Sequence, residues 1–88
     1  MDLENDFKDA VDKSSSITQR PTNEELLMLY ALYKQATEGD VSGERPGGFD
    51  FKGAAKYDTW EQLKGRDKIS CMTEYIELIN SLIEKYNG

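Results

Sequence analysis

The chain has 88 residues, with 17 acidic against 11 basic side chains, a formal net charge of -6 and no histidine. This length provides for one small hydrophobic core, so we expect a single domain over residues 1–88. The acidic balance argues against general nucleic-acid binding, and the lack of histidine removes the commonest general base and zinc ligand.

The first predicted helix covers residues 3–13. Apolar residues recur there at helical spacing, at Leu3, Phe7, Ala10 and Val11. The serine run 14–16 and Pro21 end it, because proline cannot continue a helix. The acidic, polar start of the chain does not resemble a signal peptide, and a lone cysteine favours a reducing compartment. We therefore expect a cytoplasmic protein.

The second predicted helix opens at Thr22, which forms a capping-box pattern with Glu25, and it stops at Gly39. Residues 26–33 are apolar on almost every face for two turns. A helix of this kind is covered on more than one side. In so small a domain, one of the covering surfaces can be a ligand.

Residues 38–51 are rich in glycine and predict a long irregular loop, a feature that is often functional. A third helix is predicted from a cap at Asp50 to Gly65, and a fourth begins near Asp67. The fourth has the clearest helical pattern, at Ile69, Met72, Ile76, Ile79, Ile83 and Tyr86. The sequence therefore predicts an all-α bundle of four helices.

Basic residues gather in one part of the chain: residues 45–68 hold 6 basic and 4 acidic side chains, whereas residues 1–44 hold 4 and 10. Lys52 and Lys56 are four residues apart, so they share a helix face, as do Tyr30 and Lys34. Lysines and aromatic rings in this arrangement can hold a phosphate and a purine. The same spacing also fits lysine stems that cover the core and aromatic rings that belong to it.

The sequence offers little for catalysis. It has no histidine, no nucleophile motif and no carboxylate pair at a recognisable spacing, and Cys71 has no partner base. We therefore expect a protein that is not an enzyme and that holds no metal and no cofactor.

A family resemblance rests on several motifs in order. Residues 30–40, Tyr-Ala-Leu-Tyr-Lys-Gln-Ala-Thr-Glu-Gly-Asp, resemble the Tyr-x-x-Tyr-Lys-Gln-Ala-Thr-x-Gly-Asp signature of the acyl-CoA-binding proteins. Glu-Arg-Pro-Gly at 44–47, Asp-Phe-Lys-Gly at 50–53, Ala-Lys-Tyr-Asp-Thr-Trp at 55–60 and Leu-Lys-Gly at 63–65 follow at the family's spacing. The resemblance extends from Phe7 to Tyr86.

The resemblance implies a four-helix bundle of up-down-down-up topology and a monomeric carrier of medium- and long-chain acyl-CoA esters. It assigns the tyrosines and lysines to the adenine and its 3′-phosphate, and the acyl chain to a groove beside the second helix. The acidic balance and the short apolar stretches add the expectation of no nucleic-acid partner and no stable membrane insertion, and we expect transient contact with acyl-CoA-using enzymes. Matched position by position, the ligand contacts fall on Tyr30, Ala31, Leu32, Tyr33, Lys34, Lys56 and Tyr75, with Lys52 nearby.

Two positions depart from the family pattern. Tyr57 stands where many members have tryptophan, and Ser15 stands where several have a basic residue that contacts the CoA. The nearby Lys13 is a candidate to replace that contact.

Two other functions remain open at this stage. A helical interaction module that delivers acyl-CoA to a partner enzyme would form a specific complex. A domain detached from a larger acyl-CoA-metabolising enzyme would show turnover, which the missing acid–base residues argue against.

Overall fold

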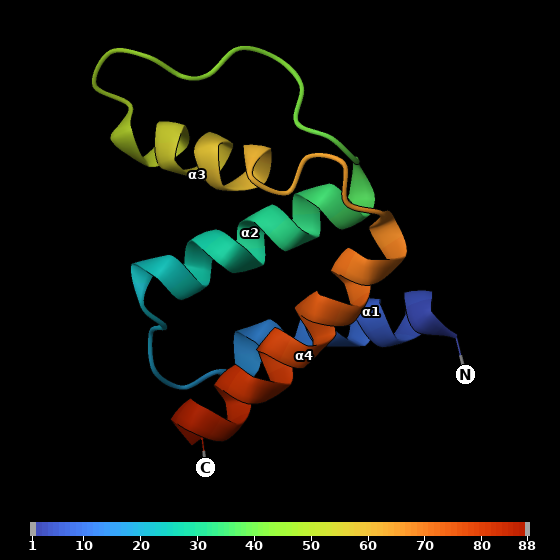
Figure 1. The fold of residues 1–88 in the computed structure, drawn as a ribbon. Coiled ribbons are helices and arrows are strands. Elements are labelled where there is room, and N and C mark those ends of the chain that lie inside the picture. The colour runs from blue at the N-terminus through green and yellow to red at the C-terminus, as the bar shows by residue number, and fades with distance from the viewer. Residues whose placement is uncertain (1, 88) are drawn as a thin grey trace.

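Residues 2–87 are the part of the chain that the computed structural model describes, and they fold into helices and loops (Figure 1). The elements are α1 (Leu3–Lys13), the 3-10 turn η1 (Ser14–Ser16), α2 (Asn23–Thr37), α3 (Phe51–Glu61) and α4 (Lys68–Asn87). In Figure 1, α2 and α3 run in one direction, and α1 and α4 run in the opposite one. The predicted all-α, up-down-down-up arrangement is confirmed.

The predicted caps are present at α2 and α3. The Glu25 N–H donates to the Thr22 hydroxyl at 3.1 Å, and the Thr22 N–H donates to the Glu25 carboxylate at 2.8 Å. At α3, the Gly53 N–H donates to Asp50 Oδ1 at 2.9 Å. Each cap satisfies a backbone donor that the first turn of a helix leaves unpaired.

The end of α3 differs from the prediction, because the helix stops at Glu61 and not at Gly65. The chain then tightens into a turn in which the Leu63 N–H donates to the Trp60 carbonyl at 3.0 Å. This turn brings the Leu63 side chain into the core, and Gly65 then takes a φ of +88° that suits glycine. Burial of one leucine therefore outweighs continuation of the helix.

Helix α2 lies at the centre of the packing. It packs against both α3 and α4, and α1 packs against α4; within residues 2–87, α3 packs against no other helix. The core cluster comprises Phe7, Ala10, Leu29, Ala31, Leu32, Ala36, Trp60, Leu63, Cys71, Tyr75, Ile79 and Leu82. The apolar character of α2 on almost every face follows from this position between two helices.

A fully buried side chain, Gln35, fixes the end of α2. Its amide N–H₂ donates to Asp40 Oδ1 at 2.9 Å and to the Arg66 carbonyl at 3.0 Å. Its Oε1 accepts from the Trp60 indole N–H at 3.2 Å, and that indole also donates to the Gly39 carbonyl at 2.9 Å. The network joins α2, α3, the loop between them and the segment before α4.

A second network joins the start of α2 to the end of α4. The Tyr86 hydroxyl donates to Glu25 Oε1 at 2.6 Å, and Lys85 pairs with Glu25 Oε2 at 3.0 Å. The Tyr86 hydroxyl, then the Thr22 N–H and then Lys85, lower the pKa of the Glu25 carboxyl from 4.5 to about 2. The carboxylate form of Glu25 therefore stabilises the fold.

None of the helices within residues 2–87 combines the length and the apolar character that a bilayer span requires.

We predict that Glu25→Gln makes stability less dependent on pH in the acid range. Because the pKa of Glu25 is lowered in the folded protein, its contribution is complete above about pH 4.5 and is lost as the pH falls toward 2. Urea unfolding at a series of pH values should show a gap between wild type and variant that is largest near neutrality and closes toward pH 2. Glu24→Gln, one position away and exposed, is the control. A gap of constant size would contradict the assignment.

We predict that Gln35→Leu lowers the free energy of unfolding by ~1–3 kcal/mol, because it leaves the Asp40 carboxylate and the Arg66 carbonyl without the buried amide donor. Thermal and urea unfolding measure the change. Gln62→Leu is the matched control, since Gln62 is exposed. An equal loss in the two variants would show that the buried amide has no special role.

Candidate functional site

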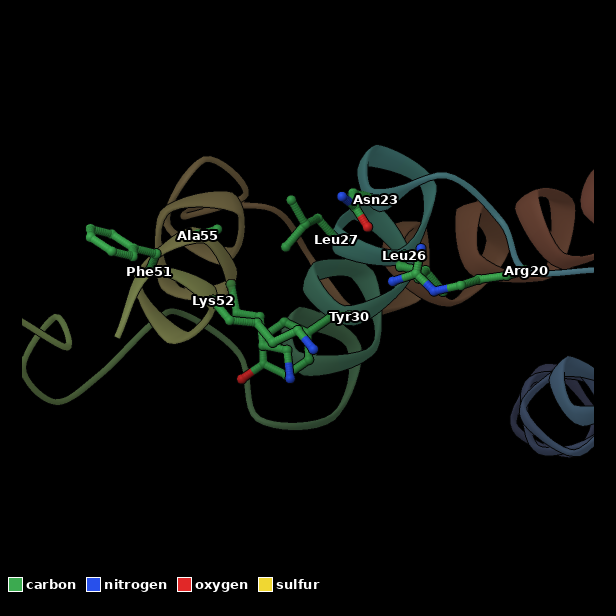
Figure 2. Close-up of a pocket in the computed structure, with 9 residues that line it drawn as sticks. Arg20, Asn23, Leu26, Leu27, Tyr30, Phe51, Lys52 and Ala55 are labelled. Carbon is green, nitrogen blue, oxygen red and sulfur yellow. The ribbon is translucent and has the colours of Figure 1, made fainter. Parts of the chain in front are cut away.

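A surface groove of about 610 Å³ lies between α2 and α3. We call it the α2–α3 groove, and it is lined by Arg20, Asn23, Leu26, Leu27, Tyr30, Phe51, Lys52, Ala55 and Lys56. Figure 2 shows Lys52 from α3 and Tyr30 from α2 extending toward one another, while Arg20 reaches in from the segment before α2. Within residues 2–87, α2 is the one helix against which α3 packs, so the groove between them is open on its outer side.

The groove combines an apolar wall with cationic groups. Leu26 and Leu27 are half-buried on α2, and Ala55 is half-buried on α3. The Lys56 ammonium lies 5.2 Å from the centre of the Tyr30 ring, within the range of a cation–π contact. Such a groove can take a ligand that is apolar over part of its length and anionic at another part.

A second hollow, of about 600 Å³, lies between α1, the end of α2 and the start of α4. Phe7 from α1 and Tyr33 from α2 both line it, and their rings stack with centroids 5.9 Å apart. The Tyr75 ring from α4 packs edge to face with the Phe7 ring, with centroids 5.1 Å apart, and its centroid lies 6.3 Å from that of Tyr33. Tyr33 is exposed and offers an aromatic face, whereas Tyr75 is buried beneath it.

Lys34 has partners of its own. Its ammonium pairs with the Glu38 carboxylate one turn along α2 and lies 5.1 Å from the centre of the Trp60 ring. The hydrogen bond from Lys34 to Glu38 raises the pKa of the ammonium, so this side chain is a cation at neutral pH. An anionic ligand that binds Lys34 must compete with Glu38.

The predicted site residues thus fall into separate groups. Tyr30, Lys52 and Lys56 meet in the α2–α3 groove. The side chains of Ala31 and Leu32 lie in the core, with exposed fractions of 0% and 3%, and they do not line the groove. Tyr33, Tyr75 and Lys34 occupy the positions described above.

Arg20 is a groove residue that the sequence analysis missed. It lies in an irregular segment with no helical spacing to relate it to other residues. Phe51 lines the groove as well, although it stands at the first position of α3 and remains exposed. Its place in the Asp-Phe-Lys-Gly motif at 50–53 was the signal that could have indicated it.

The two departures from the family pattern have structural roles. The Tyr57 hydroxyl donates to the Gly43 carbonyl at 3.2 Å and so ties the long loop to α3. The Ser15 hydroxyl donates to the Asp12 carbonyl at 2.8 Å and closes the end of α1. Neither Ser15 nor Lys13 lines the two hollows described above.

Groups that could perform chemistry are few in this fold. Cys71 is completely buried, and burial raises the pKa of its thiol. Within residues 2–87, no three His, Cys, Asp or Glu side chains gather where they could hold a metal ion.

Together these features define a small helical protein with two surface hollows, one of which joins an apolar wall to lysine and tyrosine side chains. The profile of the family described as "Acyl CoA binding protein" matches residues 4–79, and the chain belongs to this family. It is a family of binding proteins.

Relatives and solved structures cover almost the whole chain. An acyl-CoA-binding protein of Brassica napus is 43% identical over 84 residues, which span 96% of this chain and 91% of the relative. Acyl-CoA-binding protein homolog 1 of Caenorhabditis elegans is 44% identical over 82 residues, 93% and 95% of the two chains. The crystal structure of Oryza sativa Acyl-CoA-Binding Protein 2 superposes with a TM-score of 0.91 at 36% identity, covering 98% of this chain and 96% of that one.

Proposed function

We propose that the protein binds medium- and long-chain fatty acyl-CoA esters, one in its single domain, and carries them through the cytoplasm as a monomer without catalysing a reaction. The observation that carries this proposal is the α2–α3 groove, in which leucine side chains and the Tyr30–Lys52–Lys56 group are joined in one cavity. Its volume lies within the ~300–1,000 Å³ of small-molecule sites. The names of the relatives support the same ligand.

The two parts of the ligand have separate partners in this proposal. The acyl chain lies along Leu26 and Leu27, where each methylene removed from water contributes ~0.8 kcal/mol before the costs of ordering. The nucleotide lies against the tyrosine rings, and lysine ammonium groups hold its phosphates through charge-assisted hydrogen bonds. A free fatty acid lacks the second set of contacts, and free CoA lacks the first.

In this proposal the protein does not catalyse a reaction of acyl-CoA, and the bound ester is released chemically unchanged. Contact with acyl-CoA-using enzymes is transient, because the carrier has only to release its ligand near them. No metal or cofactor takes part.

The proposed ligand can be tested by calorimetric titration with CoA, with free fatty acid and with acyl-CoA esters of increasing length. We expect weak binding of the first two, and affinity for the esters that rises with chain length until the groove is full. Equal binding of free fatty acid would contradict the role of the nucleotide. Equal binding of free CoA would contradict the role of the groove.

The head-group contacts can be tested with Lys34→Ala and Lys56→Ala. Hydrogen bonds to charged groups are worth ~1.5–3 kcal/mol, so each variant should bind acyl-CoA roughly tenfold more weakly or worse. The dependence of affinity on acyl chain length should remain as in wild type. Unchanged affinity in both variants would refute the assignment of these lysines.

Glu38→Gln is the matched control, since Glu38 competes for Lys34 in the ligand-free protein. It removes the competing charge and keeps the shape of the side chain. We expect tighter acyl-CoA binding in Glu38→Gln and no gain when it is combined with Lys34→Ala. If the Glu38→Gln, Lys34→Ala double variant still bound acyl-CoA more tightly than Lys34→Ala, Glu38 would not act by competing for Lys34.

A further inference from the structure

Two phenylalanines stand in the solvent at the entry to α3. Phe49 is 93% exposed and Phe51 is 73% exposed, whereas the core aromatics Phe7, Trp60 and Tyr75 are each less than 10% exposed. The rings of Phe49 and Phe51 contact each other edge to face, with centroids 6.4 Å apart. They form one apolar tip, which we call the Phe49–Phe51 tip. Exposed apolar groups of this size mark a surface that contacts something else.

The charges near the tip leave room for an interface with lipid. Asp50 lies between the two phenylalanines, but its carboxylate accepts the Gly53 N–H and stabilises the start of α3. Lys52 follows at once, is exposed and forms no ion pair within residues 2–87. The Lys52 side chain extends toward Tyr30, away from the Phe51 ring, so it belongs to the groove and not to the tip (Figure 2). The acidic helix α1 lies far from this end of α3 (Figure 1).

The size and shape of the tip also distinguish a membrane from a protein partner. Each aromatic side chain covers ~150–250 Å², so two rings supply far less than the ~800 Å² that each partner contributes to a stable protein interface. Phe49 follows Gly47 and Gly48 in the loop and does not line a groove. Two rings that project from a loop suit a fluid interface, which closes around them without a matching pocket.

The tip adjoins the groove, because Phe51 and Lys52 both line it. Figure 2 shows Phe51 at one end of the groove, with its ring directed away from Tyr30. We propose that the Phe49–Phe51 tip docks the protein reversibly on a phospholipid bilayer, and that docking sets this end of the α2–α3 groove against the membrane surface. The docking itself does not depend on the proposed acyl-CoA ligand.

Co-sedimentation with vesicles tests the docking. We expect the wild-type protein to bind vesicles of phosphatidylcholine, with or without phosphatidylserine, because the two rings of the tip supply the contact. Phe49→Ser should lower the lipid partition coefficient roughly tenfold, the effect of withdrawing much of one ring from the bilayer. Ile69→Ser is the matched control: Ile69 is 66% exposed but lies on α4, and its variant should bind as wild type does.

A fluorescent reporter tests insertion of the tip directly. The chain has one tryptophan, Trp60, which is buried, so Phe49→Trp adds a second whose emission should shift to the blue on vesicles and be quenched by brominated acyl chains. Ile69→Trp should show neither change.

Several outcomes would overturn the proposal. They are absence of wild-type binding to either vesicle, equal binding of Phe49→Ser and wild type, and binding that needs phosphatidylserine and vanishes in salt, which would show adsorption by charge alone. Self-association that depends on Phe49, seen by sedimentation without vesicles, would assign the tip to a second copy of the chain.

Acyl-CoA titration of the same variants distinguishes failure of the docking proposal from failure of the carrier proposal. Phe49 does not line the groove, so Phe49→Ser should keep wild-type affinity, and a wild type without acyl-CoA affinity would refute the carrier function alone.

Discussion

The buried amide of Gln35 is the constraint on which the geometry of the groove depends. Helix α3 packs on α2 and on no other helix within residues 2–87, so α4 does not restrain its distance or angle. The Trp60 indole fills that role by donating to Gln35 Oε1 and to the Gly39 carbonyl. Because Gln35 also binds Asp40 and the Arg66 carbonyl, the ends of both connecting loops are held at the same point. A fully satisfied polar network in a core specifies one arrangement.

Helix α2 can contribute side chains both to the core and to the groove because it lies between α3 and α4. Leu29, Ala31 and Leu32 are buried in the core cluster, whereas Leu26 and Leu27 line the groove toward α3. An apolar groove exposed to water costs free energy, and a domain of this size has little core to offset that cost. The networks at the two ends of α2, around Glu25 and around Gln35, provide stability that does not draw on the groove face.

The helices and most of their caps could be predicted because their signals are local. The capping box at Thr22 and the cap at Asp50 depend on residues three positions apart, and they appear as predicted. The meeting of Tyr30 with Lys56 could be inferred only from family resemblance, since no spacing rule relates α2 to α3. Arg20 and the Lys34–Glu38 pair were not anticipated. Arg20 depends on the path of an irregular segment. Glu38 was assigned to the loop 38–51, although its spacing of four residues from Lys34 was a signal for the pair.

The charge of the molecule is likewise a poor guide to its site, because electrostatic effects on a small ligand are local. A net charge of -6 opposes a long polyanion, but a compact phosphate responds mainly to charges within about a Debye length of ~8–10 Å. In the groove, Lys52 and Lys56 repel one another across one turn of α3, a helix of 11 residues that is marginal in isolation. The Tyr30 ring under Lys56 offsets part of that repulsion through its negative face. Packing of α3 on α2 therefore holds two like charges together before any anion binds, and a bound phosphate would attract both ammonium groups and outweigh their mutual repulsion.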